Sequence, residues 1–204
     1  MSTRNATLRQ VWVGLRLFAI MTLGLGIVYP LAITAIGQLA APGQANGSLI
    51  SEGGSVVGSS LIGQSFTDAN GVALPQWFQS RPSAAGDGYD GSASSGSNLG
   101  PNSDKLLQQI TDRKAAIAAS DGVDPASIPP DALTASGSGL DADISPEYAR
   151  EQVARVAAAR NLSEAEVSKL VESFVAGRDA GFIGDPTVNV LQLNLALAAL
   201  SAGP

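Results

Sequence analysis

Residues 17–36, LFAIMTLGLGIVYPLAITAI, form a run of twenty residues without a charge. As a helix rising ~1.5 Å per residue, this run would span ~30 Å, the thickness of the hydrocarbon core of a bilayer. Ten of its residues are Leu, Ile, Phe or Val. At roughly −0.3 to −0.6 kcal/mol each, they favour insertion by about −3 to −6 kcal/mol. The run therefore predicts one transmembrane helix, over residues 17–37.

Basic residues lie on only one side of this run. Arg4, Arg9 and Arg16 precede it with no acid among them, and the next Lys or Arg after it is Arg81. Short basic flanks stay in the cytoplasm. We therefore expect residues 1–16 to form a cytoplasmic tail and the rest of the chain to face outward. The protein would be a single-pass protein of the cytoplasmic (inner) membrane.

Two other interpretations of the apolar run stay open. A cleaved signal peptide has an apolar core of roughly 7 to 15 residues, which is shorter than this one. The Ala-rich residues 39–42 nevertheless resemble a cleavage site, and cleavage would release a secreted binding module. The other interpretation is a buried helix of a soluble domain, which an uncharged run of this length disfavours.

The composition of the remaining chain limits what it can do. All 18 acids and nine of the 12 bases lie beyond residue 50, which leaves a net charge of −9 there. Such an acidic domain is a poor partner for nucleic acid. The chain has no Cys and no His, which excludes disulfides, thiolate nucleophiles, His or Cys metal ligands and His-dependent triads.

Local patterns predict an α/β (α+β) domain over residues 55–204, behind a Gly-, Ala- and Ser-rich linker over 38–54. Apolar pairs separated by glycines indicate strands, and hydroxyl caps followed by helical spacing indicate helices. Strands are expected at 56–66 and 76–80, and helices at 103–119, from Ser145 to Arg160, from Ser163 to Gly177 and, after a short extended piece, within 188–200.

Two loops rich in small residues, 83–103 and 131–145, interrupt these elements. The second holds Asp131, Asp141 and Asp143, which could ligate calcium, although their spacing does not match an EF-hand. A pair of them could also act as the two carboxylates of a hydrolase. A membrane-anchored extracytoplasmic hydrolase using Asp131 and Asp141 is therefore the alternative function.

Ser136 and Ser138 in the second loop are interpreted as turn residues. No G-x-S-x-G or S-x-x-K pattern surrounds them, and no His is present to serve as a base. In the membrane run, Gly24 and Gly26 form a patch of small residues. Such a patch either packs closely against another membrane helix or is merely tolerated there.

Six stretches together resemble a known family. They are SLIGQSF (60–66), RPSA (81–84), SGSNLGPNS (95–103), TASGSGLDADISP (134–146), QVARVAAARNL (152–162) and GDPTVNVLQLNLAL (184–197). In their order, behind one N-terminal membrane helix, they resemble the C subunit of the Kdp potassium-transporting P-type ATPase. The family commonly continues its GLD motif with Pro and then His, whereas this chain has Ala142 and Asp143 after Asp141.

The resemblance implies an accessory subunit of an ATP-driven potassium-import complex. Such a subunit would assemble with, and stabilise, a P-type subunit that hydrolyses ATP and a channel-like subunit that translocates potassium, and it would not be catalytic alone. The complex would use ATP, magnesium and potassium, whereas this chain by itself would bind no cofactor. Consistently, the chain lacks a D-K-T-G phosphorylation motif and a filter-like T-x-G-Y-G.

We expect the contacts with partner subunits to come from small or polar residues of the membrane helix and of the two loops. The candidates are Gly24, Gly26, Ser97, Asn98, Leu99, Ser136, Ser138 and Asp141.

Overall fold

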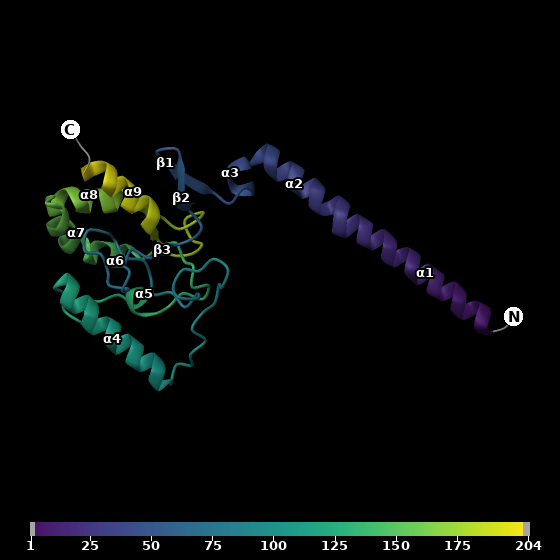
Figure 1. The fold of residues 1–204 in the computed structure, drawn as a ribbon, viewed down its shortest axis with the longest axis horizontal. Coiled ribbons are helices and arrows are strands. Elements are labelled where there is room, and N and C mark those ends of the chain that lie inside the picture. The colour runs from purple at the N-terminus through teal and green to yellow at the C-terminus, as the bar shows by residue number, and fades with distance from the viewer. Residues whose placement is uncertain (1–2, 202–204) are drawn as a thin grey trace. The chain divides into compact units, whose positions relative to one another are not determined.

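The computed structural model describes residues 3–201, with side chains over 7–200 (Figure 1). Within it, the chain divides into two compact units, residues 1–49 and residues 50–204. The first unit holds the apolar run, and the second holds the α/β region. Each unit is described by itself.

The first unit is dominated by a helix that is longer than the predicted 17–37. Helix α1 (Thr3–Leu23), the π-helical segment η1 (Gly24–Val28) and α2 (Tyr29–Ala40) follow one another without a break. The part over Thr7–Ala40 is long and apolar enough to cross a membrane. Its mean hydropathy is 2.0, and none of its most apolar stretch is buried within the protein. Residues 3–16, expected as a tail, are thus helical over the described part.

The π-helical segment has a covalent cause. Pro30 has no backbone N–H, so the carbonyl of Gly26 loses its usual partner four residues on. Directly before it, the N–H of Tyr29 bonds to the carbonyl of Gly24, five residues back. The helix thus widens by one residue in the turn that precedes the proline.

Residues 38–54 contain secondary structure where we expected an extended linker. Helix α3 (Pro42–Ala45) follows α2, and β1 (Leu49–Glu52) pairs with β2 (Ser55–Ser59) in a two-stranded hairpin. The two residues between the strands, Gly53 and Gly54, have φ of +58° and +85°. A two-residue hairpin turn of this kind needs positive φ, which glycine adopts without steric cost.

The predicted strand at 76–80 is wrong, although both backbone groups of Phe78 and of Gln79 are hydrogen-bonded. Phe78 is completely buried. Its N–H donates to Asn194 Oδ1 and its carbonyl accepts from Asn194 Nδ2, both at 2.9 Å. Gln79 exchanges the same pair of bonds with Gln152, at 2.6 and 3.2 Å. Two buried amide side chains therefore take the place of a neighbouring strand.

The remaining helices confirm most of the local signals. Ser145 accepts from the N–H of Tyr148 at the start of α6, and Ser163 forms a capping box with Glu166 at the start of α8. Gly122 and Asn161, both left-handed, end α4 and α7. These helices, with the short α5, are α4 (Asp104–Asp121), α5 (Pro130–Leu133), α6 (Pro146–Glu151), α7 (Val153–Arg160) and α8 (Glu164–Phe174).

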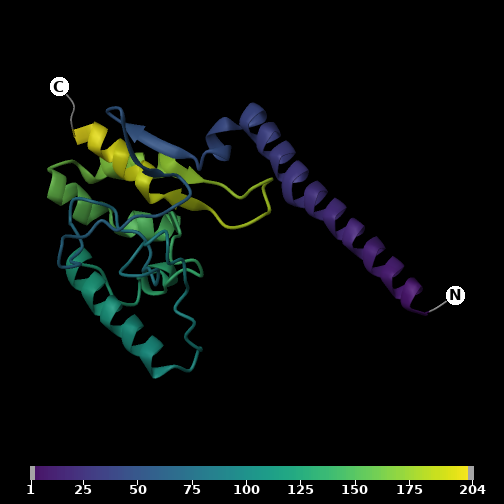
Figure 2. The ribbon, with the colours of Figure 1, turned by 45° about the vertical axis from the view of Figure 1, so that its right-hand side comes forward.

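A small antiparallel sheet and the last helix complete the domain. The strands β3 (Asp143–Ile144), β5 (Thr187–Asn189) and β4 (Val175–Ala176) lie in the order β3-β5-β4. Helix α9 (Val190–Ser201) follows β5 directly, which confirms the extended piece and helix expected over 188–200. In both views α9 lies beside α8, on the opposite side of the domain from α4 (Figures 1 and 2).

The core lies between the sheet and the helices that follow the second loop. Its fully buried members are apolar side chains from the sheet and from helices α6 to α9, together with Phe78 from the irregular segment. These include Ile144, Val156, Val167, Val171, Val188, Leu193 and Leu197. Through Phe78, the irregular residues 60–103 thereby pack against the helices.

Candidate functional site

The two loops predicted to contact partners pack against each other. The N–H of Ser95 and the hydroxyl of Ser94 both donate to the carbonyl of Ser138, at 2.9 and 3.0 Å. A Cβ atom added at Gly139, where φ is +67°, would lie 2.5 Å from the carbonyl oxygen of Ser95. One added at Gly96 would lie 2.9 Å from the carbonyl oxygen of Gly137. The glycines therefore allow two stretches about 40 residues apart in sequence to form one surface.

Two of the candidate residues serve the second loop itself. Ser136 is buried, and its hydroxyl accepts a hydrogen bond from the N–H of Gly139 at 2.9 Å. Ser138 is exposed, and its hydroxyl accepts from the N–H of Leu140 at 3.1 Å. These are local turn bonds, so the interpretation of both serines as turn residues is confirmed, and only Ser138 presents a surface.

The first loop offers the more accessible candidates. Ser97 and Leu99 line a small cavity of about 280 Å³ together with Lys105 and Arg113. Asn98 lies between them, exposed, with a left-handed φ of 51°. Within the described part of the chain, its side-chain amide has no recorded hydrogen bond, so both its donor and its acceptor face solvent.

Asp141 is tied to the domain by an ion pair. Its Oδ2 lies 3.0 Å from Arg81 Nη1, and its Oδ1 accepts from the N–H of Asp143 at 3.2 Å. The carbonyl oxygen of Asp141 would also lie only 2.2 Å from a Cβ atom at Gly63. The residue thus joins the second loop to the segment that carries Arg81, and about a third of its side chain is exposed.

The acids of the second loop converge but are already engaged. Asp131, Asp141 and Asp143 line one cavity of about 340 Å³ together with Asp185. Asp131 accepts from both the N–H and the hydroxyl of Ser145, at 2.7 and 2.9 Å. Burial raises the pKa of Asp143. Over the described residues, no group of three or more acidic side chains is arranged to hold a metal ion.

Gly24 and Gly26 belong to the first unit and open the π-helical segment. A Cβ atom at Gly24 would meet nothing within 4 Å, and one at Gly26 would touch only Thr22 Cγ2, at 3.9 Å. Neither glycine is therefore required by packing within this chain. Their role in contact with another membrane helix stays a prediction.

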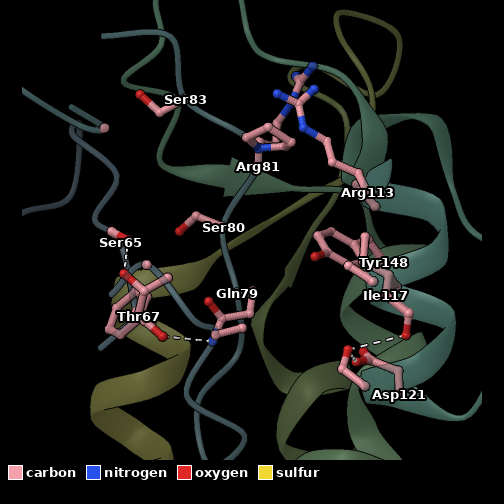
Figure 3. A pocket seen from close by; sticks show the side chains of 18 of the residues that line it. Ser65, Thr67, Gln79, Ser80, Arg81, Ser83, Arg113, Ile117, Asp121 and Tyr148 are labelled. Atoms are coloured by element: carbon pink, nitrogen blue, oxygen red, sulfur yellow. Dashed lines mark hydrogen bonds between the residues drawn. The ribbon is translucent and has the colours of Figure 1, made fainter. Parts of the chain in front are cut away.

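Sequence reasoning missed another cavity of the second unit, which has a volume of about 310 Å³ (Figure 3). It lies between the irregular residues 65–89, helix α4 and helix α6. Arg81, Arg113 and Tyr148 line it. Arg81 belongs to the RPSA stretch. Arg113 lies in helix α4, and nothing in the local sequence pattern indicates that its side chain faces this cavity.

Arg155 makes a buried ion pair that differs from the expected one. The i,i+4 spacing predicts a pair with Glu151, yet Arg155 Nε bonds to Asp121 Oδ1 at 3.0 Å, with only 6% and 4% of the two side chains exposed. Both carboxylate oxygens of Glu151 are buried without a hydrogen-bond partner. Desolvation, with the nearby acids Asp121 and Asp131, raises the pKa of Glu151 to about 7.

Comparison with known proteins extends over nearly the whole chain. The family model described as "K+-transporting ATPase, c chain" matches residues 11–199. A potassium-transporting ATPase KdpC subunit from Kineococcus radiotolerans is 57% identical over 197 residues, which is 97% of this chain and 96% of the relative. Proteins of the same name from Beijerinckia indica and Mycobacterium tuberculosis are 51% and 48% identical, over 94% of this chain and 93% and 99% of their own lengths.

The match covers the apolar helix from residue 11 onward, both loops and the sheet. The chain therefore belongs to the KdpC family, the c chain of the K+-transporting ATPase.

Proposed function

We propose that this chain is the membrane-anchored accessory subunit of an ATP-driven potassium-import complex. The single observation that carries the proposal is the match to the KdpC family over residues 11–199, with relatives at 48–57% identity. The partners would be the P-type subunit that hydrolyses ATP and the channel-like subunit that translocates potassium. ATP, magnesium and potassium would be handled by the complex through those partners.

The chain's own part in the complex would be non-catalytic. The two carboxylates of the alternative hydrolase are both occupied as acceptors, Asp141 by Arg81 and Asp131 by Ser145. A carboxylate pair for hydrolysis needs one member free to act as an acid and the other free as a nucleophile or base. No observation on the chain favours the hydrolase over the accessory subunit.

The membrane topology would follow the distribution of basic residues. With Arg9 and Arg16 in the first half of the helix and an acidic domain after it, the N-terminus would be cytoplasmic and residues 55–204 extracytoplasmic, at the inner membrane. A reporter enzyme fused after Pro204 that is active only when exported should then be active. Activity confined to a cytoplasm-dependent reporter at the same position would refute this orientation.

The surface built by the two loops is our candidate for contact with the partners. Loops held on a rigid scaffold commonly carry function, and Asn98 offers an unused amide at the edge of this surface. The substitution Asn98→Gly removes the amide without straining the positive φ. Asn161→Gly makes the same change at a φ of 56°, at the C-terminal end of α7, and serves as the matched control.

The two variants are compared by co-purification from mild-detergent membranes and by growth of potassium-uptake-deficient cells at low potassium. We expect Asn98→Gly to recover less of the partner subunits, while Asn161→Gly recovers as much as the parent chain. Equal recovery and equal growth for both variants would remove Asn98 from the contact surface. Failure of the unsubstituted chain to co-purify any potassium-transporting subunit would instead refute the proposed function.

A further inference from the structure

Two guanidinium groups meet at one end of the 310 Å³ cavity. Arg113 Nη1 donates to the carbonyl of Leu133 at 2.8 Å, and Arg81 Nη2 lies 3.5 Å from the carbonyl oxygen of the next residue, Thr134. Both arginines line the cavity, and Figure 3 shows their side chains converging at its upper edge. Since adjacent carbonyls anchor them, the two positive charges are held close together.

Their charge is only partly compensated. Arg81 has a carboxylate partner, Asp141, which lines a different cavity. Within the described part of the chain, no carboxylate lies within ion-pair distance of Arg113, and desolvation by burial lowers its pKa. The Nε of Arg81 is buried and has no hydrogen-bond acceptor. Unused, charged donors of this kind are costly unless an acceptor reaches them.

A neutral donor faces the same space from helix α6. Tyr148 is only 4% exposed, and its side chain lines the cavity. Figure 3 shows its hydroxyl pointing into the open centre, and among the described residues it has no recorded hydrogen-bond partner. A tyrosine buried to this degree usually places its hydroxyl against a partner. The hydroxyl is therefore positioned for something that occupies the cavity.

The other charged residues of the lining do not neutralise the arginines. Asp121 is the only acid among them, and it is already bonded to Arg155. Arg155 in turn also donates hydrogen bonds to two carbonyls and to the side chain of Gln152. The cavity is thus positive inside a domain whose net charge is −9. Its volume is at the lower end of the range for small-molecule sites, about 300–1,000 Å³.

We propose that this cavity binds a small oxyanion, a phosphate or carboxylate group carried on a body of a few carbon atoms. Arg113 and Arg81 hold the oxygens of the anionic group, since planar guanidinium groups suit such oxygens. The Tyr148 hydroxyl donates to the ligand from helix α6, and Phe66 and Ile117 supply apolar contact for its body. The bound anion would tie helix α4 to the irregular segment 65–89.

The three tyrosines of the chain provide the test. Tyr89 and Tyr148 line the cavity, whereas Tyr29 lies in the membrane helix. The full chain is labelled with 3-fluorotyrosine in detergent and titrated, by ¹⁹F NMR, with inorganic phosphate, acetate, glycerol 3-phosphate and ATP. Sodium chloride at equal ionic strength is the reference. We expect the Tyr148 resonance to shift saturably at millimolar concentration with at least one of the three small oxyanions, while the Tyr29 resonance stays in place.

Matched variants assign the effect to the cavity. Arg113→Gln removes the charge but keeps an amide near Leu133, and it should weaken binding by about tenfold or more, as expected for a lost charge-assisted bond. Lys114→Gln makes the same change of charge at the next residue of α4, which does not line the cavity, and should leave affinity unchanged. Tyr148→Phe, read through the Tyr89 resonance, should also weaken binding.

Three results would overturn the proposal. One is the absence of any saturable shift of Tyr148 with phosphate, acetate and glycerol 3-phosphate. Another is equal weakening by Arg113→Gln and Lys114→Gln, which would mean a diffuse charge effect. The third is saturation by ATP alone, since a nucleotide triphosphate would need a site larger than this cavity. Retention of the unliganded ¹⁹F resonances of the tyrosines that remain in each variant shows that it is folded.

Discussion

Replacing Arg155 with Ala should destabilise the domain far more than any change at a surface ion pair. Arg155 donates to Asp121 Oδ1 at 3.0 Å, to the carbonyls of Pro75 and Trp77 at 2.7 and 3.0 Å, and to Gln152 Oε1 at 2.6 Å. With 6% of its side chain exposed, it links α4, α7 and the irregular segment. Its removal leaves the buried Asp121 carboxylate without its cationic partner and the carbonyls of Pro75 and Trp77 without the arginine donor.

The expected loss is about 3–5 kcal/mol of unfolding free energy, the usual cost of breaking a buried ion pair by removing one member. The matched control is Arg150→Ala. Arg150 Nε lies 2.7 Å from Glu172 Oε1, which is closer than the buried pair, but 46% and 49% of these side chains are exposed. Because solvent screens both charges, this control should change stability little. Burial, and not the length of the bond, decides the difference.

Urea unfolding of the full chain in detergent measures both variants. Trp77 reports on the domain if Trp12, the other tryptophan, is replaced by Phe in every sample. Arg155→Ala should move the unfolding midpoint to much lower urea, and Arg150→Ala should leave it near that of the parent. Equal midpoints for the two variants would refute the argument that burial makes the Arg155 pair structural.

Three further outcomes can be measured by the same unfolding assay. Folding raises the pKa of Glu151 to about 7, so the stability that its protonated carboxyl contributes is present below the unfolded pKa near 4.5 and is lost as the pH rises through 7. Glu151→Gln should therefore stabilise the protein at pH 8 and flatten the dependence of stability on pH, and an unchanged dependence would contradict this prediction. Gly63→Ala should cost about 1–3 kcal/mol, because its Cβ would lie 2.2 Å from the Asp141 carbonyl oxygen, and a neutral result would mean that the contact relaxes freely. Ser163→Ala should cost about 1 kcal/mol by removing a capping bond, whereas Ser103→Ala should cost nothing comparable because Ser103 makes no such bond; equal losses would contradict the assignment of caps.

The helix ends show which parts of the fold could be predicted. Ser145 and Ser163 begin helices, and Gly122 and Asn161 end them, because each signal acts on backbone groups within four residues. Ser103 precedes a helix as predicted, although without the expected side-chain bond. Local chemistry thus placed these helix boundaries, whereas the predicted end at Gly177 is wrong, because α8 ends at Phe174 and β4 follows it.

The segment around Phe78 and Gln79 shows why other parts could not be predicted. A short strand is predicted there, but its hydrogen-bond partners are the side chains of Gln152 and Asn194, which are 73 and 116 residues away. Likewise, helical spacing favours Glu151 as the partner of Arg155, whereas the chosen partner, Asp121, comes from another helix. Neither choice leaves a signal in the neighbouring sequence.

The sequence by itself determined the apolar membrane helix, the acidic domain behind it and membership of the KdpC family. These follow from the length of an uncharged run, from charge counts and from the order of motifs, and none of them requires knowing which residues touch. Only the tertiary structure decided that the two small-residue loops form one surface and that Arg81, Arg113 and Tyr148 line one cavity. These contacts depend on how distant segments pack around a shared core. The local sequence around each residue does not indicate which distant residues it will contact.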